Sequence, residues 1–179
     1  MAPLPNRAPE IALPSTALRG MRDALAASAG HEAAADALRS AGHAAGDAFF
    51  EILTAGEVTG DQPAEAFWKR FSQLFASRGW GTLRYSEVHP GVGALDATAW
   101  AEARADNTAE QPSCHFTTGM LANLLGRVAG ADVAVLEVEC RSRGDSRCRF
   151  LFGGTDAVFA VYERLATGEP ADAALQQIG

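Results

Sequence analysis

The most constraining feature of the sequence is a hairpin pattern in its last third. Two β-rich runs, Val133–Val138 and Arg149–Phe152, flank a polar segment that contains Gly144-Asp145, a pair typical of tight turns. Just before them, apolar residues recur at helical spacing over Phe116–Val128. A helix followed by two short strands predicts an α+β fold, with a small antiparallel sheet packed against helices.

The rest of the chain extends this pattern. Residues 1–14 contain four prolines and are predicted to form a flexible tail, followed by one domain over residues 15–179. Gly42 and Gly46 lie four residues apart in a helical segment, which favours close packing of another element over phosphate binding. The further helices are predicted at Ser15–Ala29, His31–Thr54, Pro63–Gly79, Asp156–Ala166 and Ala171–Ile178, and the further strands at Trp80–Val88 and Ala94–Arg104.

Charge and motifs exclude several classes of function. The net charge of −7 argues against direct binding of nucleic acid, which needs a basic face. No run of about eighteen apolar residues is present to span a membrane, and the start does not resemble a signal peptide, so a cytoplasmic protein is expected. Serine-triad, dinucleotide-binding and P-loop patterns are absent from the sequence, which favours a binding role over catalysis.

Three cysteines and one glutamate are the candidate metal ligands. The predicted hairpin brings Cys140 close to Cys148, and a bend at Val138–Cys140 would turn Glu137 toward them. Cys114 lies at a predicted helix start, where free amide groups favour a thiolate. Three thiolates and a carboxylate suit a structural Zn²⁺ ion. Spacing alone favours buried free thiols over a metal site, and a disulfide between the two hairpin cysteines is a further alternative.

Three stretches of the sequence resemble the 4-vinyl reductase domain family. They are Cys114-His115-Phe116-Thr117-Thr118-Gly119, Glu137-Val138-Glu139-Cys140 and Gly144-Asp145-Ser146-Arg147-Cys148-Arg149-Phe150. The family includes a bacteriochlorophyll-synthesis protein and the sensor domains of phenol- and xylene-responsive bacterial activators, and its fold resembles TRAPP-complex subunits and haem nitric oxide sensors. The resemblance implies a zinc subdomain over about residues 114–152, with Cys114, Glu137, Cys140 and Cys148 as the ligands.

The resemblance also implies an apolar ligand pocket beside the zinc. Helical spacing places Thr118 on the face of Cys114, and strand alternation places Val135 on the face of Glu137. Aromatic side chains on the preceding strands offer stacking surfaces, although simple core packing is the alternative for each of them. The candidate ligand-binding residues are Trp80, Tyr85, Trp100, Thr118, Val135 and His43.

These residues support three functional hypotheses. The preferred one is a zinc-stabilised sensor or carrier domain for a hydrophobic, aromatic small molecule, which passes its signal to a partner chain. The second is a tetrapyrrole-binding accessory protein or vinyl reductase of pigment synthesis. The third is a ligand-free scaffold that dimerises through its N-terminal helices. A homodimer is expected under all three, because alanine-rich helices with glycine on one face pack closely.

Overall fold

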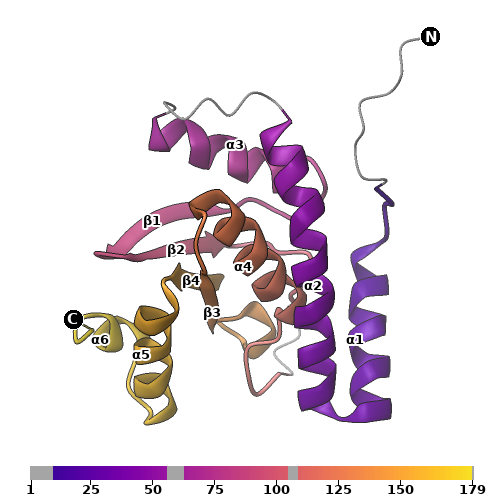
Figure 1. Ribbon diagram of the computed structural model, residues 1–179. Coiled ribbons are helices and arrows are strands. Elements are labelled where there is room, and N and C mark those ends of the chain that lie inside the picture. Colours follow the sequence, from indigo (N-terminus) through magenta and orange to yellow (C-terminus); the bar gives the residue numbers. More distant parts are fainter. Residues whose placement is uncertain (1–9, 56–62, 105–108, 179) are drawn as a thin grey trace.

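A four-stranded antiparallel sheet with helices on both faces forms the protein (Figure 1). The computed structural model describes residues 10–55, 63–104 and 109–178. The predicted tail lies outside these ranges up to residue 9, whereas residues 10–14 precede the first helix without regular structure. The elements are α1 (Ser15–Ala29), α2 (His31–Thr54), α3 (Ala64–Ala76), β1 (Arg84–His89), β2 (Val92–Ala97), α4 (His115–Ala129), β3 (Ala134–Glu139), η1 (Arg141–Arg143), β4 (Cys148–Gly153), α5 (Thr155–Ala166) and α6 (Ala171–Leu175).

The strand order in the sheet is β1-β2-β4-β3, so two sequence hairpins lie side by side. The predicted hairpin of the last third is β3–β4, and its turn closes through a short 3₁₀ helix. Gly144 follows that helix with a φ of 101°, a left-handed conformation that favours glycine. The predicted α+β class, with a small antiparallel sheet packed against helices, is therefore confirmed.

Each face of the sheet contributes to a separate apolar cluster. Leu95 and Phe150 point to the face that α2, α3 and α4 cover, where most of the aromatic side chains gather. Ala94 and Leu151 point to the opposite face, where they pack under α5 and α6. Both pairs alternate along β2 and β4, as side chains on a strand do. The central strands are thus buried on both sides.

Helices α2 and α4 approach each other closely because glycines line their contact. A Cβ atom added to Gly42 would lie 1.9 Å from the carbonyl oxygen of Phe116, and one added to Gly119 would lie 2.0 Å from that of Arg39. The predicted close packing at Gly42 and Gly46 is confirmed, because both glycines are buried against α4. This contact fixes the start of α4 beside the sheet.

Two strand predictions were wrong in their boundaries. Trp80 precedes β1, which begins only at Arg84, and Trp100 follows β2, which ends at Ala97. An isolated bridge between Gly81 and Trp100 is what remains of pairing in these segments. The chain leaves the sheet after β2 because its side chains there bond to the start of α4, as described below. The last helix ends at Leu175 instead of Ile178, and no helix in the described ranges is long and apolar enough to cross a membrane.

Candidate metal centre

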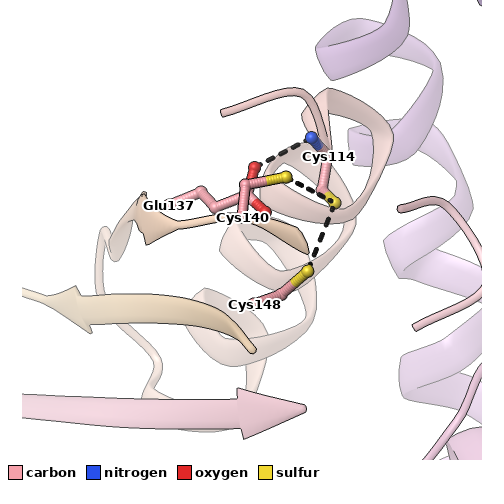
Figure 2. A group of neighbouring side chains, drawn as sticks. All are labelled: Cys114, Glu137, Cys140 and Cys148. Carbon is pink, nitrogen blue, oxygen red and sulfur yellow. Dashed lines mark hydrogen bonds between the residues drawn. The ribbon is translucent and has the colours of Figure 1, made fainter. Parts of the chain in front are cut away.

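Four buried side chains from separate elements converge beside the start of α4. Cys114 is the residue just before α4, Glu137 lies in β3, Cys140 follows β3, and Cys148 begins β4. One potential ligand atom from each residue lies within 4.8 Å of the others. Figure 2 shows the three sulfur atoms and the carboxylate turned toward one another. The structure therefore brings together all four residues that the sequence singled out as metal ligands.

Local backbone irregularities place Glu137 and Cys140 on the same side. The pairing of β3 with β4 shifts register between Glu137 and Glu139, so the predicted bend near Val138 is confirmed as a β-bulge. The backbone N–H of Cys140 donates to Oδ2 of Asp145 at 2.7 Å. The turn thus holds the cysteine at the point where the chain leaves the strand. Sequence reasoning found Asp145 only as a turn residue.

The Glu137 carboxylate links the hairpin to the helix. Its Oε2 atom accepts a hydrogen bond of 2.8 Å from the backbone N–H of Cys114. Its Oε1 atom is buried and has no hydrogen-bond partner within the described residues. A buried carboxylate oxygen without a partner is unfavourable by a few kcal/mol. A bound cation would supply the missing partner.

The three cysteines are free thiols and completely buried. The Sγ atom of Cys114 lies 4.0 Å from that of Cys140 and 4.0 Å from that of Cys148. Sulfur atoms in a disulfide are about 2 Å apart, so the predicted alternative of a Cys140–Cys148 disulfide is not present. Separations near 4 Å leave space for one ion between the sulfur atoms.

The protonation equilibria of the cluster reflect several acids confined in one dry volume. Burial raises the pKa of the Cys114 thiol and also that of the Glu137 carboxyl, because each anion would lose its hydration. The pKa of Cys140 is lowered, since the thiols of Cys114 and Cys148 donate hydrogen bonds to its sulfur. A single thiolate is thus favoured by the protein alone. A divalent cation would stabilise further anions in the same space.

A second buried carboxylate, Glu102, was missed by sequence reasoning. Its two oxygens accept the backbone N–H groups of Phe116 and Thr117, at 2.9 Å and 2.8 Å, in the first turn of α4. The Thr117 hydroxyl also donates to this carboxylate and accepts a 2.8 Å hydrogen bond from Nε1 of Trp100. Burial raises the pKa of Glu102 to about 7. The cap comes from a residue far from the usual N-cap position, so no local motif reveals it.

The aromatic candidates for ligand binding lie in the core on the helix-covered face. Tyr85 stacks on Trp68 with ring centroids 4.0 Å apart, and Trp80 stacks on Phe116 at 5.7 Å. Trp100 is only 4% exposed and contacts the aromatic side chains of the same cluster. This cluster also includes the three cysteines, so aromatic rings and the candidate metal centre share one core.

The other three candidates lie elsewhere. Thr118 and Val135 line an open groove beside β3, which Glu137 also borders. His43 is exposed on α2, where its Nδ1 atom lies 3.2 Å from Nδ2 of Asn123. The six predicted ligand-binding residues are therefore distributed over the core, the groove and the surface of α2.

Comparisons with known proteins agree with this arrangement. Residues 99–153, the segment that contains the four candidate ligands, match the model of the 4-vinyl reductase domain family. An uncharacterized protein of Methanocaldococcus jannaschii is 32% identical over 85 residues, and the alignment spans 46% of this chain but only 45% of that relative. The chain thus spans less than half of the length of this curated relative.

Two solved structures are similar to the whole fold. The phenol-responsive sensory domain of the transcription activator PoxR, crystallised with phenol, superposes with a TM-score of 0.68 at 18% sequence identity, over 90% of this chain and 84% of that one. A vinyl-4-reductase family protein from Methanocaldococcus jannaschii gives a TM-score of 0.49 at 20% identity, over 81% of this chain and 82% of that one. At such identity the PoxR domain shows that the fold is shared.

Proposed function

We propose that this chain, which carries a 4-vinyl reductase domain over residues 99–153, is a zinc-stabilised binding domain for a hydrophobic, aromatic small molecule. The observation that carries the proposal is the buried cluster of three thiols and one carboxylate beside an aromatic core. The role is that of a sensor or carrier, consistent with the name of the PoxR domain, which is described as phenol-responsive.

The donor set of the cluster supports zinc as the metal. Sulfur ligands favour soft or borderline ions such as Zn²⁺, whereas magnesium and calcium require oxygen ligands. Cys114, Glu137, Cys140 and Cys148 would hold the ion, and the unpaired Oε1 of Glu137 fits a ligand atom. Four protein ligands complete a tetrahedral site, so the ion would have a structural role. It would tie the start of α4 to the hairpin that carries the other three ligands.

The position of the cluster supports a coupled ligand site in the aromatic core. Trp100 bonds to Thr117, which lies three residues after Cys114 in the first turn of α4. An aromatic guest that packs against Trp100 would thus act on the turn that carries a metal ligand. Stacked and edge-to-face rings are also the environment that aromatic guests prefer.

Thermal denaturation with small aromatic compounds tests this function. The protein, purified with its native metal, is melted with phenol, cresols and xylenes, and with cyclohexanol as a non-aromatic control of similar size. A compound at 100 times its Kd is expected to stabilise the fold by about 2.7 kcal/mol. Raised melting temperatures with aromatics alone would support the proposal. Equal responses to phenol and cyclohexanol would contradict it, and a Soret band on addition of porphyrin would favour tetrapyrrole binding instead.

Assembly and location belong to the same proposal. A homodimer through the N-terminal helices is supported by α1, in which none of the residues is buried and Met21 is 48% exposed. A signalling partner chain and a cytoplasmic location fit a sensor domain without a motif for its own catalysis. Sedimentation velocity of the purified protein measures the oligomeric state directly, and a monomer at micromolar concentration would contradict the dimer.

A further inference from the structure

The outer edge of β3 is free within the described part of the chain. The sheet ends at β3 on one side and at β1 on the other (Figure 1). A strand at an edge directs alternate backbone N–H and C=O groups away from the sheet. β1 carries the exposed charged residues Arg84 and Glu87, which discourage pairing with another strand. The first half of β3, Ala134–Leu136, is apolar and has no such protection.

The acidic residues of β3 do not guard its edge. The Glu137 side chain is directed into the candidate metal centre, and Glu139 pairs with Arg147 at 2.8 Å. At the end of the strand, Nη2 of Arg143 donates to the carbonyl oxygen of Val138 at 3.0 Å. The stretch from Ala134 to Glu137 therefore remains accessible to a new hydrogen-bonding partner.

Two adjoining hollows follow this edge. A groove of about 720 Å³ lies between α4 and the α5–α6 connection, and a hollow of about 400 Å³ lies between β3 and α5. Both are lined by Val135, Leu136 and Tyr162. Together they form a trough along the free edge, bounded by helices on both faces of the sheet.

An exposed aromatic pair lies beside the trough. Phe159 and Tyr162 are 56% and 52% exposed, and their ring centroids are 6.2 Å apart on α5. Large apolar side chains exposed side by side next to an unpaired strand are typical of a docking site.

The other part of the trough carries positive charge. Arg39 on α2 and Arg143 after β3 both line the groove. Asp36 contacts Nη1 of Arg39 at 2.6 Å, but the Arg39 side chain stays half exposed. Each guanidinium has five N–H donors, so both can bind a second carboxylate. The trough therefore offers an aromatic surface, a backbone edge and two cations in one line.

We propose that this trough binds an extended, acidic segment of a partner protein, which adds a fifth strand beside β3. Only an extended backbone can pair with the free N–H and C=O groups of Ala134–Glu137. An apolar side chain of the segment would pack on Phe159 and Tyr162, and a carboxylate would bind Arg39 and Arg143. Since β3 also carries Glu137, the partner would contact the same strand as the metal centre, and the proposal depends on neither the metal nor the small molecule.

Selection from a random octapeptide library displayed on phage, with the full chain as purified, tests the proposal. Enriched sequences are expected to combine an acidic residue with alternating apolar residues. Their synthetic peptides should bind at least tenfold more weakly to Phe159→Ser and to Arg39→Glu. Val128→Ser and Arg84→Glu, which alter exposed residues outside the trough, are the matched controls and should bind normally. Circular dichroism melts verify that all four variants fold.

Hydrogen exchange locates the contact. Amides in residues 134–137 should exchange more slowly when a selected peptide is bound. A library without enriched peptides, or peptides that bind Phe159→Ser and Arg39→Glu as tightly as the wild type, would overturn the proposal. Protection of the same amides in the peptide-free protein that disappears on dilution would show that a second copy of this chain covers the edge, which would also overturn it.

Discussion

Replacement of Cys148 by serine is the sharpest mutational test of the metal centre. Cys148 is completely buried at the start of β4, and its sulfur lies 4.0 Å from that of Cys114. Serine keeps the size and polarity of the side chain approximately, but it removes the thiolate that binds zinc. The variant therefore tests metal binding with little change in packing.

The expected loss follows from linkage between binding and folding. A metal that binds only the folded chain contributes about 2.7 kcal/mol at 100 times its Kd and about 4.1 kcal/mol at 1,000 times its Kd. For a domain of this size, 1 kcal/mol corresponds to about 2–4 °C in Tm. Loss of the metal should therefore lower the Tm by roughly 5–16 °C.

The assay is thermal unfolding with and without the chelator EDTA. The chain has only three cysteines, all in the cluster, so metal removal replaces a control cysteine variant. EDTA should lower the Tm of the wild type toward that of Cys148→Ser, and should change the variant little. If the variant retains as much zinc as the wild type and EDTA lowers both Tm values equally, the assigned ligands are wrong.

Three further predictions concern the surroundings of the centre. Because the folded pKa of Glu102 is about 7 and its ordinary value is 4.5, its contribution to stability falls as pH rises through this range. In urea unfolding, wild type should lose about 2 kcal/mol relative to Glu102→Gln between pH 5.5 and 8, and parallel pH profiles would refute this. Gly42→Ala places a Cβ atom 1.9 Å from a backbone oxygen and should destabilise by about 1–3 kcal/mol or more; the exposed control Gly20→Ala, which meets nothing within 4 Å, should stabilise by about 0.5–1 kcal/mol, and equal effects would disprove the close contact. Trp100→Ala should lower the free energy of unfolding by about 3–5 kcal/mol, whereas a change below about 1 kcal/mol would show that the side chain is not part of the core.

The ligand cluster could be predicted from the sequence because it depends mainly on local structure. A two-residue turn signal at Gly144-Asp145 brings Cys140 and Cys148 together, and a single bulge reorients Glu137. These are short-range consequences of strand alternation. The resemblance to a zinc-containing family then placed Cys114 in the same set.

The missed features depend on long-range contacts. Sequence periodicity placed Trp100 in a strand, but the segment after Ala97 leaves the sheet to satisfy the first turn of α4. Glu102 makes that contact from a distant position, so its role depends on the tertiary structure. The trough beside β3 likewise depends on how α4 and α5 flank the edge.

X-ray absorption at the zinc K-edge, on protein purified without added metal, measures the proposed centre most directly. A closed structural site predicts one zinc per chain, with three sulfur atoms at about 2.3 Å and one oxygen at about 2.0–2.2 Å. Protein without zinc, or zinc surrounded only by nitrogen and oxygen, would contradict the assignment of Cys114, Glu137, Cys140 and Cys148 as its ligands.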